Sequence, residues 1–276
     1  MCGLAGVLLA ERPRTQSELS AVADIFTRLL VASEHRGRHA TGVAIVNARG
    51  EYCVSKAPVR ASEFVRGRGY RAVLDRLDSD TTCLMGHTRW PTRGSHLDNA
   101  NNHPLVSGGE QESRMQGPTP GVCILTHNGH IQNAASLFQA LDLPRKAQVD
   151  SEILLRLAEA NLVETGIDPG GFAEDISRCR GKLSAVVVAT SDPTRILLIK
   201  GNQPLEARCH APRGLVAYAS ESRILDGVLG LGTGWREIRI PAWRLVVADT
   251  RRITPLRGYR IPQPGREHDW RWDTCL

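Results

Sequence analysis

The residue at position 2 of the chain is a cysteine, directly after Met1. A methionine that precedes a residue as small as Cys2 is normally removed, which would leave Cys2 with a free α-amino group. That amine has an ordinary pKa of about 7.7–8.0 and lies within reach of the thiol of the same residue. One residue then supplies both a nucleophile and a general base for attack on a carbonyl carbon. A cysteine at position 2 is weak evidence alone, so this chemistry depends on further residues.

Clusters of polar residues follow two of the expected strands. Gly86-His87-Thr88-Arg89-Trp90 and Thr126-His127-Asn128-Gly129 each continue an apolar segment, and Asn101-Asn102-His103-Pro104 lies between them. A fourth cluster, Asp150-Ser151-Glu152, opens an expected helix. Sites are often built where rigid elements end and loops begin. We therefore expect these groups to meet Cys2 in one site.

These clusters form an ordered series that resembles the class II glutamine amidotransferases, in particular the glutaminase half of glucosamine-6-phosphate synthase. The resemblance covers residues 2–250 and leaves 251–276 as an Arg/Pro/Trp-rich extension. The motifs that carry it are Cys2-Gly3-Leu4-Ala5-Gly6, His35-Arg36-Gly37 with Thr41-Gly42, Gly86-His87-Thr88-Arg89-Trp90, Asn102-His103-Pro104, His127-Asn128-Gly129 and Asp150-Ser151-Glu152.

The resemblance implies an α+β fold of the N-terminal-nucleophile hydrolase type, an αββα sandwich with two antiparallel sheets between helical layers. It also implies hydrolysis of the side-chain amide of L-glutamine to glutamate and ammonia through a thioester on Cys2. This chemistry requires no metal and no organic cofactor, and the sequence contains no cluster of metal-ligand residues that indicates one.

The tetrahedral intermediate of such a reaction carries an oxyanion that fixed donors must stabilise. The side-chain N–H of Asn128 and the backbone N–H of Gly129 are the expected donors, with glycine allowing a close backbone approach. An Asn-Gly pair is also typical of a simple type I′ turn, and the pair alone does not exclude that interpretation.

The resemblance assigns the substrate's α-carboxylate to Arg89, whose planar guanidinium suits bidentate binding. It assigns the α-ammonium to Asp150, which also stands where a helix N-cap is expected; both roles can coexist. Trp90 and Thr92 are expected to line the pocket. His103 is either a structural histidine that holds the loop before Pro104 or a direct substrate contact.

Arg36 is expected to be a scaffold residue near the nucleophile rather than a catalyst. The chain departs from the synthase pattern Trp-Ala-Thr-His-Gly, since it has Trp90-Pro91-Thr92-Arg93-Gly94. Pro91 stiffens this loop. Arg93 either adds a second cation near the substrate carboxylate or faces solvent, and neither change removes a group needed for hydrolysis.

The isomerase half of the synthase has no counterpart in these 276 residues. We therefore expect ammonia to be delivered to a synthase or ligase subunit on a separate polypeptide. One alternative is an amidohydrolase that acts on a γ-glutamyl amide within a larger molecule; Arg89 and Asp150 together favour free glutamine instead. A second alternative is a catalytically idle, glutamine-sensing module, which the intact nucleophile and oxyanion donors argue against.

The elements that must position these residues can be read from apolar periodicity. Residues 2–9 predict a buried strand, and Leu19, Val22, Ile25, Phe26, Leu29 and Leu30 share one face of a helix that Ser17 could cap. Further strands are expected at 41–47, 51–56, 82–87, 122–126, 184–190, 195–200, 215–219 and 243–248, and helices at 134–141 and 151–164. Strands in adjacent pairs, with helices grouped between them, favour antiparallel sheets covered by helices.

Two segments have no such periodicity. Residues 107–121 are rich in Gly, Pro and polar residues and predict an exposed loop. The tail from Arg251 is either a strap packed on the domain or a docking segment, because Trp and Arg are enriched at interfaces.

Composition excludes several classes of function. The formal charge of +6 is spread along the chain without a Lys/Arg block, which argues against specific nucleic-acid binding. There is no apolar run of about 18 residues, so no membrane span is expected. Seven widely spaced cysteines fit neither a zinc site nor a disulfide framework, and we expect a reducing cytoplasm.

Overall fold

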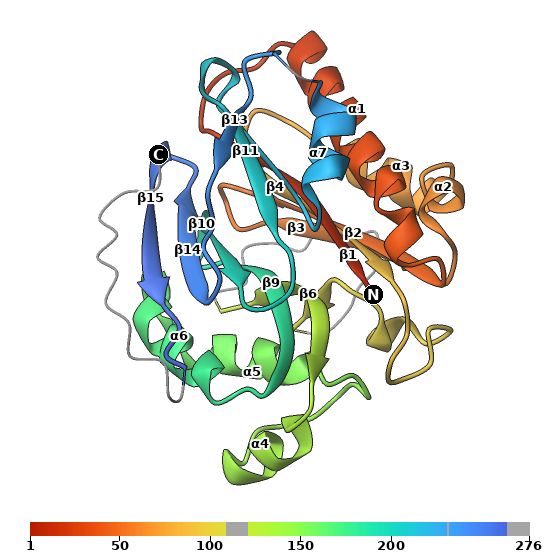
Figure 1. Ribbon diagram of the computed structural model, residues 1–276. Coiled ribbons are helices and arrows are strands. Elements are labelled where there is room, and N and C mark those ends of the chain that lie inside the picture. The colour runs from red at the N-terminus through yellow and green to blue at the C-terminus, as the bar shows by residue number, and fades with distance from the viewer. Residues whose placement is uncertain (109–120, 231, 264–276) are drawn as a thin grey trace.

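A computed structural model describes residues 1–108, 121–230 and 232–263 (Figure 1). Two antiparallel sheets form its centre. The first, sheet A, has seven strands in the order β13 (Arg236–Ile238), β11 (Glu206–His210), β12 (Leu215–Ala219), β1 (Gly3–Leu9), β4 (Thr81–Arg89), β2 (Ala40–Asn47) and β3 (Tyr52–Ala57). The second, sheet B, has six: β15 (Arg252–Arg260), β14 (Arg244–Asp249), β10 (Asp192–Lys200), β9 (Gly181–Ala189), β6 (Cys123–Ile131) and β5 (Leu105–Val106). A short hairpin, β7 (Leu162–Val163) and β8 (Gly166–Ile167), forms a separate two-stranded sheet.

Helices cover the outer face of each sheet (Figure 1). Sheet A carries α1 (Gln16–Ala32), α2 (Ala61–Phe64), α3 (Arg68–Leu74) and α7 (Ser222–Leu229). Sheet B carries α5 (Glu152–Ala160) and α6 (Pro169–Ser177), and α4 (Ala134–Ala140) packs against α5. Three 3₁₀ turns occur at Glu34–Arg36, Asn99–Asn101 and Ala211–Arg213. The predicted layers, helix on sheet on sheet on helix, are confirmed.

Because both sheets are covered on both faces, their central strands are continuous apolar runs rather than alternating ones. In β1, Leu4 and Leu8 pack between the two sheets, while Ala5, Val7 and Leu9 pack under the helices of sheet A. Every residue of β1 is buried. The strand that follows Cys2 is therefore held from both sides, and it fixes where the nucleophile begins.

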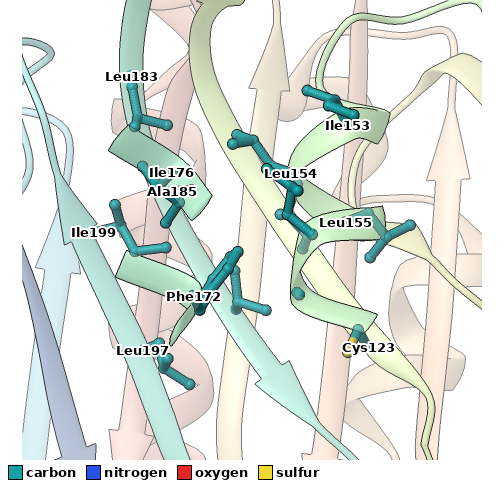
Figure 2. Packing of buried hydrophobic residues seen from close by; sticks show 14 of the residues in the cluster. Cys123, Ile153, Leu154, Leu155, Phe172, Ile176, Leu183, Ala185, Leu197 and Ile199 are labelled. Atoms are coloured by element: carbon teal, nitrogen blue, oxygen red, sulfur yellow. The ribbon is translucent and has the colours of Figure 1, made fainter. Parts of the chain in front are cut away.

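The core between sheet B and its helices is likewise built from apolar side chains of both layers (Figure 2). Phe172 and Ile176 of α6 and Leu154 of α5 meet the outward side chains of the sheet, such as Leu183 and Ala185 of β9. All five are at most 2% exposed. This packing holds β9 against β6 in a register that pairs Gly129 with Leu183 and His130 with Lys182.

Most predicted elements are found, and several differ at their ends. The predicted apolar face of α1 is buried in full, but its N-cap is Thr15 rather than Ser17, because the Thr15 and Glu18 side chains form a reciprocal capping box. The helix predicted over 151–164 ends at Ala160. Helices α2, α3, α6 and α7 and strands β5, β7, β8, β11, β13 and β15 were not predicted.

The segment predicted as an appended tail begins inside sheet B, because β15 pairs along β14 from Asp249↔Arg252 to Arg244↔Arg260. A domain boundary at 250/251 would therefore cut a β-hairpin. Residues 264–276, which include Trp270 and Trp272, lie outside the described residues, as do residues 109–120 of the predicted loop. Within the described part of the chain, no helix is both long and apolar enough to cross a membrane.

Candidate active site

Cys2 lies at the start of β1, against the residue that follows β4. Its Sγ accepts from the Trp90 backbone N–H at 3.4 Å and lies 3.5 Å from the Trp90 carbonyl oxygen. Burial raises the pKa of the thiol, although the Trp90 N–H and the positive charges of the N-terminus, Arg89 and Arg36 act in the opposite direction. The thiol is therefore protonated at neutral pH, and a reaction through sulfur needs a base beside it.

Arg36 is buried and binds the backbone of the nucleophile rather than its thiol. Its Nε donates to the Cys2 carbonyl oxygen at 2.8 Å, and its Nη1 forms an ion pair with Glu221, just before α7. Glu221 also pairs with Arg223. These contacts fit the predicted scaffold role, because Arg36 fixes the peptide that carries the sulfur.

Asn128 reaches the same carbonyl from sheet B. With its amide nitrogen facing Cys2, it donates to the Cys2 carbonyl oxygen at 3.0 Å and accepts from Arg36 Nη2 at 3.2 Å. An amide nitrogen has two N–H groups, so one of them stays available for a ligand. Cys2, Arg36 and Asn128 thus form one hydrogen-bonded unit, which we call the nucleophile cluster.

The Asn128-Gly129 pair is not a turn, because β6 continues through both residues to Ile131. Gly129 has φ +153°, and a Cβ at this position would overlap the carbonyl oxygen of Lys182 on the neighbouring strand. Only glycine fits here. The backbone of Gly129 therefore lies close to the neighbouring strand β9 and also lines the cavity.

A cavity of about 470 Å³ opens beside Cys2, within the usual size of small-molecule sites. It lies between the sheets' ends, since both sheets contribute to its wall. The N-terminus and the segment after β4 supply Met1, Cys2, Trp90, Thr92 and Arg93. The strands of sheet B and their flanks supply Asn128, Gly129, His130, Gln132, Lys182 and Gln203. Trp90 and Thr92, which the resemblance assigns to the substrate pocket, both line this cavity.

Arg89 lies behind the loop that follows Trp90. It is 4% exposed and does not line the cavity. Its Nη1 donates to Asn102 Oδ1 at 2.6 Å and to the Ser95 carbonyl at 3.3 Å. Its Nη2 donates to the carbonyls of Arg93 at 2.6 Å and Gly94 at 3.0 Å. Both terminal nitrogens hold the loop after Trp90, and burial lowers the pKa of this guanidinium.

His103 is the middle ring of a buried stack. Its ring centroid lies 4.4 Å from that of His87 and 6.4 Å from that of His127. Its Nδ1 accepts from the His127 backbone N–H at 2.9 Å, and the peptide bond to Pro104 is cis. His103 does not line the cavity. Of the two alternatives, this geometry supports a histidine that holds the loop.

The stack ties the two sheets together behind the cavity. His87 of β4 lies 3.0 Å, through Nε2, from the His127 carbonyl oxygen of β6, and His127 Nδ1 lies 2.7 Å from Ser151 Oγ. Burial lowers the pKa of His87 to about 3 and that of His127 to about 4, and lowers the pKa of His103 well below its usual range. All three rings are neutral at pH 7, so these contacts position Asn128 and Gly129 without adding charge.

Asp150 is 3% exposed and does not line the cavity. Its Oδ2 accepts from the Ile131 backbone N–H at 2.5 Å and lies 3.2 Å from His130 Nδ1. It does not cap α5 either, since Ser151 stands at the N-cap position and makes no side-chain cap bond. The contacts of Asp150 thus hold the end of β6, which is followed by the cavity residue Gln132.

Four of the described cavity residues were missed by the sequence analysis: His130, Gln132, Lys182 and Gln203. His130 directly follows the His127-Asn128-Gly129 motif, so its position beside the site could have been predicted from the sequence. Lys182 arrives only because β9 pairs with β6, and Gln203 follows the next strand, β10. Among the described residues, no group of three or more His, Cys, Asp or Glu side chains is arranged to hold a metal.

Comparisons with known proteins agree with this arrangement. No family model matches the chain. It is 30% identical over 210 residues to the isomerizing glutamine–fructose-6-phosphate aminotransferase of Aeropyrum pernix, a match that covers 74% of this chain and 30% of that protein. The corresponding enzyme of Staphylococcus epidermidis is 25% identical over 261 residues, which is 94% of this chain and 38% of the relative. The chain therefore spans about a third of the length of the curated relatives it matches.

Solved structures share the fold. The glutamine phosphoribosylpyrophosphate amidotransferase of B. subtilis superimposes with a TM-score of 0.66 and 18% identity, covering 95% of this chain and 49% of that one. A structure described as the allosteric regulatory enzyme of purine biosynthesis gives a TM-score of 0.68 at 18% identity, with the same coverage. The predicted N-terminal-nucleophile fold is confirmed.

Proposed function

This chain belongs to the class II glutamine amidotransferases, and on that premise we propose that it hydrolyses the side-chain amide of L-glutamine to glutamate and ammonia, with Cys2 as the nucleophile. The observation that carries the proposal is the nucleophile cluster at the wall of a ligand-sized cavity. Arg36 and Asn128 both bind the Cys2 carbonyl oxygen, so the sulfur is fixed where a bound amide would meet it.

The reaction needs the α-amine of Cys2, because burial keeps the thiol protonated. Once Met1 is removed, this amine takes the thiol proton while sulfur forms a bond to the Cδ carbon of glutamine. The tetrahedral intermediate collapses as the amine protonates the leaving nitrogen, so the C–N bond breaks and ammonia leaves. Water then gives a proton to the amine and attacks the thioester, and the C–S bond breaks to release glutamate.

Two donors stand where the oxyanion would form. The free N–H of the Asn128 amide and the backbone N–H of Gly129 both belong to residues that line the cavity beside Cys2. The histidine stack and the pairing of β6 with β9 hold them before substrate arrives. Fixed donors of this kind need no reorganisation at the moment of reaction, which is why they stabilise the intermediate strongly.

In this proposal the ammonia is delivered to an acceptor site outside residues 1–276, in a synthase or ligase. The support comes from the relatives, since the curated ones are named as aminotransferases and their matched part is about a third of their length. The cavity residues of the described chain include the nucleophile and its donors but nothing that specifies the acceptor.

The decisive test is ammonia and glutamate release from L-glutamine by the purified chain, with intact mass measured to establish that Met1 is absent. The Cys2→Ala variant is the matched control, since alanine is also small enough for Met1 removal. We expect the variant to lose at least about a thousandfold in rate, because the covalent path is gone. Full activity of Cys2→Ala, or no glutamate from wild-type protein lacking Met1 even with its acceptor protein present, would overturn the proposal.

A further inference from the structure

Arg36 can hold the nucleophile only as firmly as its own guanidinium is held. Its Nε donates to the Cys2 carbonyl oxygen at 2.8 Å, and its Nη2 donates to the side chain of Asn128 at 3.2 Å. Both acceptors are neutral, so neither balances the charge of this buried arginine. A buried charge is costly unless it is paired. The position of Arg36 therefore depends on the carboxylate that faces its remaining terminal nitrogen.

Glu221 supplies that carboxylate. Its Oε1 accepts from Arg36 Nη1, and its Oε2 accepts from Arg223 Nε. Partial burial works against the ionised form, but the hydrogen bonds from Arg223 and Arg36 lower the pKa of the Glu221 carboxyl, so it is charged at neutral pH. Within the described residues, it is the only acidic side chain that pairs with Arg36.

The backbone that carries Glu221 is fixed against the strand that carries Cys2. Ser220 is fully buried, and its Oγ accepts from the Leu4 backbone N–H at 2.9 Å. The Ser220 N–H donates to the Leu4 carbonyl oxygen, also at 2.9 Å. Leu4 lies two residues after Cys2, and Ser220 lies directly before Glu221. The carboxylate is therefore held at a constant distance from the peptide of the nucleophile.

The helix that follows Glu221 does not account for the direction of its side chain. Glu221 occupies the N-cap position of α7, but its side chain makes no cap hydrogen bond. An N-cap side chain ordinarily accepts from a backbone N–H in the first turn of its helix. Here both carboxylate oxygens face arginines instead, and one of these arginines, Arg36, binds the nucleophile.

We propose that Glu221 is a positioning residue of the reaction: it holds Arg36, and through Arg36 it holds the Cys2 peptide where the sulfur attacks the bound amide. The inference rests on the proposed function, because it concerns the same nucleophile. Glu221 is not among the described residues that line the cavity, so it affects the chemical step and not the binding of substrate.

The test compares Glu221→Gln with a matched control on the same helix, Asp226→Asn. Glutamine has one acceptor oxygen where Glu221 has two, so it cannot accept from both arginines. We expect kcat for L-glutamine to fall about 10–100-fold, as for a slightly displaced nucleophile, with KM changed less than about threefold. Asp226 pairs with Arg208 instead of Arg36, so Asp226→Asn should change neither constant.

Glu221→Asp and the thermal midpoint separate positioning from folding. Aspartate keeps the charge and both acceptor oxygens on a shorter side chain, so this variant should lose less of kcat than Glu221→Gln. The thermal midpoint of each variant establishes that it is folded at the assay temperature. A rise in KM with kcat kept, or equal kcat in Glu221→Gln and wild type, would rule out the positioning role.

A double-mutant cycle tests whether Glu221 acts through Arg36. Arg36→Met keeps an unbranched side chain and removes every donor of the guanidinium. In that background, Glu221→Gln should change kcat by less than about twofold, since no guanidinium remains to be held. If the two factors multiply instead, Glu221 acts by another route and the proposal is wrong.

Hydrogen exchange gives a readout that does not depend on turnover. Glu221→Gln and Arg36→Met should both speed exchange of the backbone amides at the start of β1, because the peptide before them is no longer held. Asp226→Asn should not. Unchanged exchange in Glu221→Gln would contradict the positioning role. If wild-type protein lacking Met1 releases no glutamate while this exchange pattern holds, the proposed reaction alone is overturned.

Discussion

The two sides of the cavity are built in opposite ways. On the nucleophile side, Arg36, Asn128 and the Cys2 carbonyl form a closed hydrogen-bonded unit that is complete without substrate. On the opposite side, which we call the recognition side, Arg93 and Lys182 line the cavity, are exposed and have no side-chain partner within the described residues. The groups around the nucleophile are thus already held in place before a ligand binds, whereas the two cations on the other side have no counter-charge until an anionic ligand supplies one. Substitutions on the two sides should accordingly change different kinetic constants.

Among the substitutions that test this contrast, Asn128→Ala is expected to have the largest effect, and the effect is on kcat. Loss of one oxyanion donor costs about 10²–10³ in kcat in comparable sites. KM for glutamine should change little, because Asn128 belongs to the nucleophile cluster and not to the recognition side. Steady-state kinetics with L-glutamine measures both constants. A variant in which KM rises while kcat is kept would place Asn128 on the recognition side and remove the contrast.

A smaller effect, on KM, is expected from Arg89→Gln. The loop that carries Arg93 loses the two terminal nitrogens that hold its carbonyls, so KM for glutamine should rise about 10–100-fold. A double-mutant cycle with Arg93→Gln separates the two possible roles. If Arg89 acts through Arg93, the second substitution adds little to the first. Additive effects would show that Arg89 binds the carboxylate independently.

The smallest effect concerns stability behind the nucleophile side. Burial lowers the pKa of His87 from its usual 6.5 to about 3, so between these pH values the unfolded chain binds a proton that the folded chain does not. Stability should therefore fall as pH drops from about 6.5 towards 3, by about 1.4 kcal/mol per pH unit for this one group.

His87→Gln removes that titration while keeping a nitrogen donor for the His127 carbonyl. Urea unfolding at pH 7, 6 and 5 should show a shallower loss of stability in the variant than in the wild type, by about one proton. An unchanged slope would mean that His87 is charged in the folded protein, and that the stack contributes charge to the nucleophile side after all.

Much of the fold could be predicted because it depends on local periodicity. The buried face of α1 and the central strands follow from apolar spacing alone. Some misses were also local: Thr15-Gln16-Ser17-Glu18 is a capping-box signature, and Asp168 with Pro169 marks the start of α6. In α6, Gly170 and Gly171 weaken the helical signal, and tertiary packing of Phe172 overrides it.

Site residues could be predicted where the residue type itself indicates the chemistry. They could not be predicted where strand pairing or loop conformation decides which side chains reach the cavity. Cys2, Asn128 and Gly129 line one cavity, since each belongs to a motif at the start of β1 or in β6. Lys182 reaches the cavity only through the register of β9 against β6, which no local pattern encodes. The position of Arg89 depends on how the loop after Trp90 folds back, and that conformation is invisible in residue types.

Because β1 lies in the middle of sheet A, it pairs with both of its neighbouring strands only after most of the chain has been synthesised. β1 pairs with β4 on one side and with β12 on the other, where Ala5 faces Ala219. At ribosomal rates of about 5–20 residues per second, tens of seconds separate the emergence of these partners. Cys2 therefore leaves the ribosome well before β12 does, and the surroundings that the folded chain gives it form late. Under the proposed function, this interval leaves Met1 open to an aminopeptidase before the site is assembled.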